Sequence, residues 1–413
     1  VILKYSKPDE LVLDYFCGAG TTAVECKLLG RRCIGFDIND KAIELAKENV
    51  NFRIKPSQLT LFDEESHLKV HEPKLMVSDA RDLSFLQNNS IDLICAHPPY
   101  ANIIHYTDSK EGDLSFFDIN EFLKEMAMVA KESFRVLKSG RHCAILIGDT
   151  RKKKHVIPLG FKLINVYLNA GFKLKELVIK RQHNCKTTGF WYANSIKYNF
   201  LLLAHEYLPI FEKPKVTTLS VGEREVNYGS VIPSLEKPSL KKKLDELETT
   251  TVWVFPKENF EKCLNKNVIA RYSNGDSYSI IAFVSHSKNE TCFSERKGKK
   301  NRRLLFIKSP FLSNNPSRSN IEHYLKKTKK IVNRELPNIN KGGFLVIQTQ
   351  DVRIEGYIEP LAKRLVDMFT TDELWLKEIV LVTRKEKASV VQPSSEYLKI
   401  GHQYLLVYEK RER

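Results

Sequence analysis

Apolar and polar positions along the first fifty residues follow the pattern of a strand, a turn, a helix and a second strand. Residues 10–16 (ELVLDYF) form an apolar run with β character, and residues 17–22 (CGAGTT) interrupt it. Residues 23–30 have helical spacing that ends at Gly30, and residues 31–39 (RRCIGFDIN) form a second apolar strand with an acid near its end. This order predicts a βαβ unit that opens an α/β domain.

The pattern continues downstream as expected for such a domain. It predicts a strand at 91–96, an amphipathic helix at 119–140, a strand at 141–149, a helix at 156–171 and a strand pair at 173–180 and 197–206. We expect this first domain to end near residue 212.

The composition of the chain indicates the number of domains and the kind of binding partner. The 413 residues, 42% of them hydrophobic, suffice for two domains with real cores. The formal net charge of +16 indicates a polyanionic partner, and nucleic acid is favoured over membrane because no basic amphipathic helix or long apolar stretch occurs. A solvated basic surface is the alternative.

The cysteines and the chain start bear on the compartment. Eight cysteines form no CxxC pair, and no signal peptide or membrane-spanning run is recognisable, which predicts buried thiols, no metal site and a cytoplasmic protein. The chain begins at Val1 without a Met, which leaves open whether a preceding segment is missing.

The turn after the first strand carries the first candidate chemistry. Gly18 and Gly20 allow a ligand to approach the backbone where a helix begins. Asp37, about 20 residues further on, can accept hydrogen bonds from ribose hydroxyls. A dinucleotide loop needs a third glycine, but this loop continues as GAGTTA. Together with Asp14 before the loop, the pattern predicts a nucleoside cofactor without phosphates.

Residues 14–39 (DYFCGAGTTAVECKLLGRRCIGFDIN) resemble the S-adenosylmethionine loop of DNA amino-methyltransferases, whose pattern is Asp-Pro-Phe-x-Gly-Ser-Gly-Thr-Thr. Tyr15 stands where the family usually has Pro, a departure that we expect to leave binding intact. The resemblance implies that Asp37 binds the ribose and that Asp79, in VSDARDL, reaches the adenine amino group, although Asp79 alone is equally typical of a helix cap. The cofactor-binding residues that it implies are Asp14, Phe16, Gly18, Gly20, Thr21, Thr22, Asp37 and Asp79.

The predicted strand at 91–96 leads into His97, Pro98, Pro99 and Tyr100. This HPPY turn resembles the catalytic (Asp/Asn/Ser)-Pro-Pro-(Tyr/Phe) motif of enzymes that methylate exocyclic amino groups. An aromatic amine is a poor nucleophile, and rigidly held acceptors around its nitrogen help it to lose a proton. The resemblance implies that the residue 97 side chain and the Pro98 carbonyl accept from the amine, while Tyr100 stacks on a base flipped out of the duplex.

His97 departs from the family, which has Asp, Asn or Ser at this position. A neutral imidazole accepts through one ring nitrogen, whereas a protonated one cannot accept, so we expect methyl transfer to weaken at acidic pH. Ser is associated with cytosine N4 and Asp mostly with adenine N6, and we place cytosine N4 slightly ahead. A C5-cytosine mechanism is disfavoured because the chain contains no Pro-Cys dipeptide.

The second half repeats the first weakly. Four of its segments, at 267–283, 304–315, 342–353 and 402–410, parallel segments at 1–16, 93–104, 140–151 and 198–206 in the same order. The second copy lacks the chemistry, because Ile281, Ser285 and Ser287 stand in place of Asp14, Gly18 and Gly20.

The resulting domain prediction is a Rossmann-like catalytic methyltransferase domain at 1–212, a linker at 213–248 and a degenerate methyltransferase-like α/β domain at 249–413. Residues 249–256 (TTTVWVFP) resemble the family segment that covers the methionine end of the cofactor. The second domain is therefore expected either to recognise DNA or to cover the cofactor site.

Basic segments suggest where DNA contacts the chain. The runs at 295–303 (ERKGKKNRR) and 326–330 (KKTKK) are by default solvated faces, and in an enzyme that holds DNA they are also candidate phosphate contacts. Residues 181–195 (RQHNCKTTGFWYANS) mix basic and aromatic side chains, with an ordinary strand connection as the alternative.

We predict an enzyme that methylates an exocyclic amine in double-stranded DNA. The alternatives are an RNA amino-methyltransferase and a non-catalytic DNA-binding subunit. The sequence leaves open whether a cognate restriction endonuclease accompanies the chain and whether it forms a homodimer.

Overall fold

The structure, a computed structural model, describes residues 1–53, 69–100, 107, 112–182, 189–215, 247–274, 277–283, 293–298, 301–309, 316–385 and 397–411. The chain forms two compact units. The first comprises Val1–Gly148, Leu159–Lys180 and the stretch that begins at Glu206, and the second comprises Asp149–Pro158, Arg181–His205 and the C-terminal half. Two segments of the first half thus belong to the second unit. The contiguous boundaries near 212 and 249 stay a prediction, since most of the expected linker lies outside the described residues.

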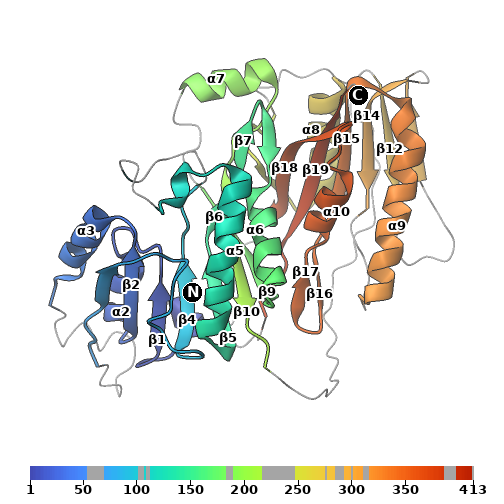
Figure 1. Cartoon of the computed structure of the whole chain (residues 1–413). Helices are drawn as coiled ribbons and strands as arrows, with labels where there is room; N and C mark the ends of the chain where they lie inside the picture. The colour runs from blue at the N-terminus through green and yellow to red at the C-terminus, as the bar shows by residue number, and fades with distance from the viewer. Residues whose placement is uncertain are drawn as a thin grey trace. The chain divides into compact units, whose positions relative to one another are not determined.

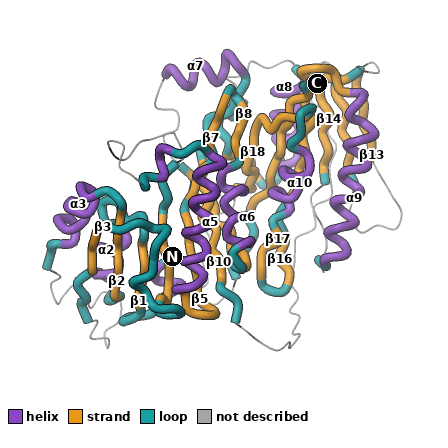
Figure 2. The backbone as a smooth tube through the Cα atoms, viewed as in Figure 1, coloured by secondary structure: helices purple, strands orange, loops and turns teal. Residues whose placement is uncertain are grey.

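A mixed sheet forms the centre of the first unit (Figures 1 and 2). Its strands are β1 (Leu11–Asp14), β2 (Arg32–Asp37), β3 (Lys74–Val77), β4 (Ile91–Ala96), β5 (Leu137–Ile145), β6 (Ile147–Gly148), β9 (Lys173–Arg181) and β10 (His205–Glu212). Their order is β3-β2-β1-β4-β5-β10-β6, and β9 pairs with β10. Strands β1 to β5 run parallel and β10 is antiparallel to β5.

The helices of the first unit are α1 (Ile2–Tyr5), α2 (Thr21–Leu28), α3 (Asp40–Val50), α5 (Ile119–Val136) and α6 (Leu159–Asn169), with a short 3₁₀ helix at Leu114–Phe116. Helix α5 begins at a capping box in which Asp118 and Glu121 satisfy backbone amides. It ends at Val136 rather than at Gly140, because Leu137 already pairs with β4 as the first residue of β5. The predicted Rossmann-like α/β fold is confirmed.

The expected strand at 197–206 is wrong. Residues Gly189–Tyr198 form helix α7, and β10 begins only at His205. The apolar run between them is buried without joining a sheet: Leu202 exchanges backbone hydrogen bonds with Thr249 and Thr251 instead. Periodicity identified burial correctly but could not distinguish this pairing from a strand of the first sheet.

A seven-stranded sheet forms the second unit, in the order β11-β18-β19-β15-β14-β12-β13. Its strands are β11 (Val252–Pro256), β12 (Tyr278–Ala282), β13 (Phe293–Lys297), β14 (Arg302–Lys308), β15 (Ile339–Thr349), β18 (Leu374–Lys385) and β19 (His402–Lys410). Two hairpins, β7 (Thr150–Lys152) with β8 (His155–Ile157) and β16 (Val352–Ile354) with β17 (Tyr357–Glu359), accompany α7, α8 (Phe260–Ser273), α9 (Arg318–Glu335) and α10 (Leu361–Phe369).

The two sheets share one topology. The order β12-β14-β15-β19-β18 repeats the order β1-β4-β5-β10-β9, and the pairings of β12 with β14, β14 with β15 and β15 with β19 have the same parallel or antiparallel sense. This arrangement supports the predicted duplication and corrects one match: the counterpart of 402–410 (HQYLLVYEK) is 205–213 (HEYLPIFEK), because these residues form β19 and β10.

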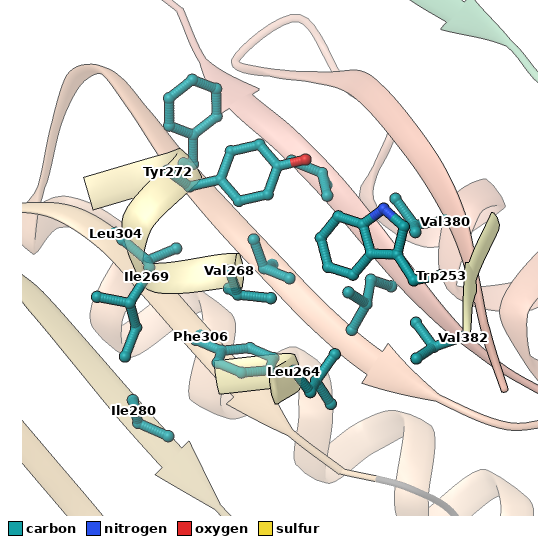
Figure 3. Close-up of a cluster of buried hydrophobic side chains, with 14 of the residues drawn as sticks. Trp253, Leu264, Val268, Ile269, Tyr272, Ile280, Leu304, Phe306, Val380 and Val382 are labelled. Carbon is teal, nitrogen blue, oxygen red and sulfur yellow. The ribbon is translucent and has the colours of Figure 1, made fainter. Parts of the chain in front are cut away.

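Trp253 of β11 lies in the core of the second unit, where it is fully buried and packs with α8 and the central strands (Figure 3). Leu201, from the first half of the chain, belongs to the same cluster. The segment at 250–256, expected to cover the cofactor, is therefore a strand of this core, and its role toward the first copy stays a prediction.

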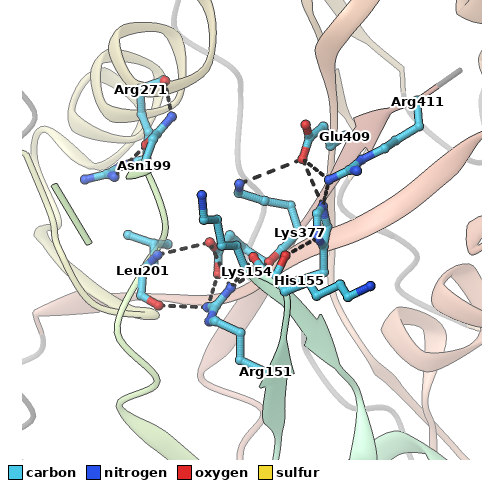
Figure 4. Close-up of polar contacts among 11 residues, drawn as sticks. Arg151, Lys154, His155, Asn199, Leu201, Arg271, Lys377, Glu409 and Arg411 are labelled. Carbon is cyan, nitrogen blue, oxygen red and sulfur yellow. Dashed lines mark hydrogen bonds and ion pairs between the residues drawn. The ribbon is translucent and has the colours of Figure 1, made fainter. Parts of the chain in front are cut away.

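A buried ion pair fixes the first-half segments within this unit (Figure 4). The Arg151 guanidinium donates to Glu378 Oε2 at 2.6 Å and to the Leu201 carbonyl at 2.7 Å. Glu378 Oε1 accepts from the Leu201 amide at 3.0 Å, and the Glu378 side chain is 1% exposed. One carboxylate thus holds both the β7–β8 hairpin and the stretch before β10.

The expected phosphate contacts are only partly exposed. Arg302 is buried and pairs with Glu335 at 3.0 Å, so its prediction as a phosphate contact is wrong. Lys299 and Lys300 lie outside the described residues, whereas Arg303 is exposed. No helix among the described residues is long and apolar enough to span a membrane.

Replacing Glu378 with Ala should destabilise the second unit strongly. The change leaves the Arg151 charge and the Leu201 amide buried without their acceptor, so we expect the free energy of unfolding to fall by about 3–5 kcal/mol. All of the chain's tryptophans (Trp191, Trp253 and Trp375) belong to this unit, so urea unfolding followed by tryptophan fluorescence reports on it.

Glu322→Ala is the matched control, because it breaks an exposed pair with Arg364 in the same unit. We expect it to cost at most about 1 kcal/mol. Equal losses in the two variants would refute the structural role of the buried pair.

Candidate active site

A cavity of about 330 Å³ lies at the carboxyl ends of β1, β2 and β4. The chain passes from β1 to its neighbour β2 on one side and reaches β4 on the other, so the loops after β1 and β4 diverge at this point. Open α/β sheets bind ligands at such a switch point. Of the predicted site residues, the cavity lining includes Asp14, Phe16, Gly18, Thr21, Thr22, Asp37, Asp79, His97, Pro98 and Pro99, but neither Gly20 nor Tyr100.

The two glycines of the first loop serve different purposes. Both have positive φ, +49° at Gly18 and +82° at Gly20. A Cβ at Gly18 would meet nothing within 4 Å, which leaves its backbone open to a ligand. A Cβ at Gly20 would come within 2.9 Å of Ala46 Cβ, so Gly20 lets the loop pack on α3.

Two carboxylates face the cavity from the ends of β1 and β2, the buried Asp14 and the half-buried Asp37. Asp14 accepts hydrogen bonds from the Phe16 amide at 3.1 Å and from the Thr22 side chain, and burial raises its pKa to about 7. Asp37 accepts from the amides of Gly18 and Asn39, each at 3.0 Å, and burial also raises its pKa. Desolvated carboxylates of this kind favour a ligand that brings positive charge or hydroxyl donors.

Asp79 lines the same cavity but is held by a neighbour. Arg81 donates to both of its carboxylate oxygens, at 2.5 to 3.1 Å, and also to Glu125 at 2.6 Å. Gly112 has a φ of +89°, and a Cβ there would come within 3.1 Å of Asp79 Oδ2. Residues Gly112–Leu114 therefore close this side of the cavity, and no pattern in their sequence indicated it.

The turn after β4 forms a second polar group. His97 is exposed at the cavity lining, and its Nε2 lies 3.3 Å from the Tyr100 hydroxyl. The Tyr100 hydroxyl donates to Glu206 Oε1 at 2.5 Å, and Glu206 lies 2.8 Å from Lys180 Nζ. Glu206 was not predicted, because its strand begins later than periodicity indicated.

Packing fixes the Tyr100 ring as well. A Cβ at Gly148 would lie 3.2 Å from Tyr100 Cε1, and the His97 and Tyr100 rings meet edge to face with centroids 5.7 Å apart. Desolvation by surrounding protein lowers the pKa of His97 below its usual range and outweighs the opposite effect of Glu206. His97 is therefore neutral at pH 7, with a ring nitrogen available as an acceptor.

Comparisons with known proteins follow the same residues. A family model, N6_N4_Mtase, described as DNA methylase, matches residues 1–48 and 91–301, which include both the glycine loop and the HPPY turn. Type II methyltransferase M.HinfI of Haemophilus influenzae is 37% identical over 87 residues, 21% of this chain and 23% of that protein. tRNA (guanine(10)-N2)-dimethyltransferase of Methanothermobacter thermautotrophicus is 31% identical over 100 residues, 24% and 25% of the two chains.

The chain thus spans about a quarter of the length of these relatives. Among solved structures, a SAM-dependent methyltransferase of Methanosarcina mazei aligns with 52% of this chain and 96% of its own, at 18% identity and a TM-score of 0.32.

The raised pKa of Asp14 predicts a pH-dependent stability. A carboxyl whose pKa is higher in the folded state contributes stability that is fully present below its unfolded pKa, 3.8, and is lost as pH rises through about 7. Asp14→Asn keeps an acceptor oxygen without the charge, so we expect the variant to match its parent near pH 4 and to exceed it by up to about 4 kcal/mol at pH 8.

Hydrogen–deuterium exchange of peptides from β1 and β4, compared at equal pH, measures this difference. Asp82→Asn is the control, since this carboxylate is exposed and hydrogen bonding to Ser84 lowers its pKa. A constant difference between Asp14→Asn and its parent from pH 4 to pH 8 would contradict the assignment.

Proposed function

Because the chain belongs to the N6_N4_Mtase family of DNA methylases, we propose that it transfers a methyl group from S-adenosylmethionine to an exocyclic amino group of a base flipped out of DNA. The membership confirms the predicted family, the class of methyltransferase and S-adenosylmethionine as the cofactor. The observation that carries the proposal is that one cavity is lined by the glycine loop, by Asp37 and by the His97–Pro98–Pro99 turn.

The residues of the cavity fit this cofactor. Its volume is at the low end of the range for small-molecule sites. S-adenosylmethionine carries an ammonium and a sulfonium cation, and Asp14, Asp37 and Asp79 supply negative charge in the same cavity. The open backbone at Gly18 leaves room for a ligand beside the N-terminus of α2.

We assign the residues by this fit. Asp14, Phe16, Gly18, Thr21 and Thr22 hold the methionine part, Asp37 binds the ribose, and Asp79 with the Gly112–Leu114 segment encloses the adenine end. Gly20 supports the loop through its packing on Ala46 and does not contact the cofactor.

The bound cofactor supplies an electrophilic methyl group. On the other side, the ring nitrogen of neutral His97 and the Pro98 carbonyl accept hydrogen bonds from the target amine. As the amine becomes cationic in the transition state, acceptors held in place by Pro98 and Pro99 stabilise the developing charge without reorganising.

We favour cytosine N4 over adenine N6 as the target. The family associates Ser with cytosine N4 and Asp mostly with adenine N6, and His97 with its lowered pKa is an uncharged acceptor at pH 7, as Ser is. The partner is double-stranded DNA. A cognate restriction endonuclease and a homodimer stay open possibilities, as they were from the sequence.

Transfer of labelled methyl groups tests the function. The full chain, S-adenosylmethionine labelled in its methyl group, and duplex DNA from an unmethylated strain should give labelled N4-methyldeoxycytidine after digestion to nucleosides. Label found only in N6-methyldeoxyadenosine would show that the target is adenine N6 instead of cytosine N4. Label found only in transfer RNA would favour an RNA substrate, and no label in any nucleic acid would refute the function.

His97→Ala in the same assay should lower the single-turnover rate by about 10², with nearly unchanged affinity for DNA and cofactor, because the acceptor acts mainly in the transition state. His97→Ser should retain more activity than His97→Ala and should lose the decline in rate that the parent shows at acidic pH. A His97→Ala variant that methylates as fast as its parent would show that His97 takes no part in methyl transfer.

The hydrogen bond between Tyr100 and Glu206 predicts a loss of base capture, in contrast to the loss of rate expected for His97→Ala. Glu206→Gln and Tyr100→Phe keep the ring but remove or weaken its anchor, so capture of the base should weaken about 3- to 10-fold, close to the net contribution of one hydrogen bond. Tyr100→Ala removes the stacking surface and should cost more, about 1–3 kcal/mol per base. Fluorescence of a 2-aminopurine at the target position measures flipping directly.

Lys162→Ala serves as a control, since this exposed lysine lies on α6 of the same unit, away from the cavity lining. Equal flipping in Glu206→Gln and in the control would mean that Glu206 does not position Tyr100.

A further inference from the structure

Helix α7 leaves its largest apolar side chains uncovered. Among its ten residues, Gly189–Tyr198, only Ser195 is buried. Phe190 is 69% exposed, Trp191 56% and Tyr198 40%, and the Phe190 and Trp191 rings meet edge to face at 5.5 Å. A helix that presents adjacent aromatic rings to solvent is typical of a binding surface.

The β7–β8 hairpin carries lysines where the backbone favours glycine. Its turn residues, Lys153 and Lys154, have φ values of +48° and +69°. Two-residue hairpin turns with positive φ at both positions prefer Asn-Gly or Asp-Gly, and a non-glycine residue in this conformation is strained. The corresponding hairpin of the second copy, β16–β17, uses Glu355 and Gly356 at φ of +49° and +81°. The first copy thus has a basic turn without the favoured glycine.

The hairpin turn and α7 form one surface within the second unit (Figures 1 and 2). Lys154 Nζ lies 3.8 Å from the centroid of the Tyr198 ring, and Lys197 Nζ lies 5.1 Å from it. Residues 150–157 and 189–198 contain no Asp or Glu. Lys154 and Lys197 therefore lie at the exposed Tyr198 ring, Lys152 and Lys153 are exposed on the same hairpin, and neither element carries an acidic side chain.

We propose that this surface, the α7–hairpin surface, binds DNA, with phosphates on Lys152, Lys153 and Lys154 and bases against Phe190 and Trp191. Clustered lysines match the charge of a phosphate backbone, and aromatic side chains stack on or wedge between bases in a sequence-tolerant way. The inference rests on DNA as the substrate of the proposed function and assigns the second unit a share of DNA binding. It gives a physical reason for the strained Lys-Lys turn, since both ammonium groups project from a single tight bend.

Fluorescence anisotropy of a fluorescein-labelled 30-base-pair duplex with the full chain tests the surface. Lys152→Ala/Lys153→Ala/Lys154→Ala should weaken binding at least about tenfold near 0.1 M salt and flatten the salt dependence by about two to three units of slope, one per lost phosphate contact. Phe190→Ala/Trp191→Ala should weaken binding at least about fivefold with the slope unchanged, because no charge is removed. Trp191→Phe should abolish quenching of tryptophan fluorescence by DNA.

A matched variant distinguishes DNA binding at this surface from a general effect of the protein's positive charge. Lys257→Ala/Lys266→Ala/Lys385→Ala removes three exposed charges from the same unit, outside the α7–hairpin surface and outside the basic runs at 295–303 and 326–330, and we expect a smaller loss of affinity and slope. Equal losses from the two triple variants, or parental affinity in the hairpin variant, would overturn the surface. Tighter binding of duplex RNA than of DNA to the parent would show that the partner was wrongly chosen.

Parental methylation of DNA, measured in parallel, keeps the two proposals apart. If the parent methylates DNA and the hairpin variant binds DNA as tightly as the parent, only the proposed surface is refuted. If the parent binds DNA through the surface but does not methylate it, only the proposed function is refuted.

Discussion

The first unit depends on the parallel pairing of β1 with β4. Val12 and Leu13 of β1 lie opposite Leu93 and Ile94 of β4, all four side chains are buried, and the strands end together at one edge of the sheet. Since the chain leaves them in opposite directions, a cavity opens between the two loops. The glycine loop and the HPPY turn, about 80 residues apart in sequence, face this cavity for that reason alone.

The second unit has the same strand order as the first but differs at the residue that corresponds to His97. In the parallel between 93–104 and 304–315, Lys308 stands in the place of His97. Its ammonium is buried, pairs with Glu261 and donates to Asn265 at 2.9 Å. An ammonium has no lone pair with which to accept from an amine, and this one is already held by α8. The residue that ends β14 has thus become part of the core, which is consistent with a copy that keeps the fold and lacks the reaction.

Residues with a local physical signature could be predicted from the sequence. Gly18 needs a positive φ, Asp37 ends a buried strand, and the two prolines follow another, so spacing alone pointed to one edge of a parallel sheet. Contacts made by chain topology could not be predicted. Glu206 meets Tyr100 only because β10 starts at His205, and Arg302 is buried only because Glu335 lies at the end of α9. The prediction of a strand at 197–206 was wrong for the same reason. The sequence indicated that the run is buried, but Glu378, the acceptor that the Leu201 amide needs, lies 177 residues away.

Desolvation, and not the surrounding carboxylates, lowers the pKa of His97, since Glu206 acts to raise it. The cavity already contains Asp14, Asp37 and Asp79, and Glu206 lies one hydroxyl group beyond residue 97, on the far side of Tyr100. A carboxylate at position 97 would add a like charge near Glu206, and their repulsion would raise its pKa toward the protonated form, which cannot accept from both of its oxygens. An imidazole avoids that repulsion, since desolvation keeps it unprotonated and leaves an acceptor at neutral pH. His97 therefore stays an acceptor because its desolvation outweighs the opposing effect of Glu206, the carboxylate that anchors Tyr100.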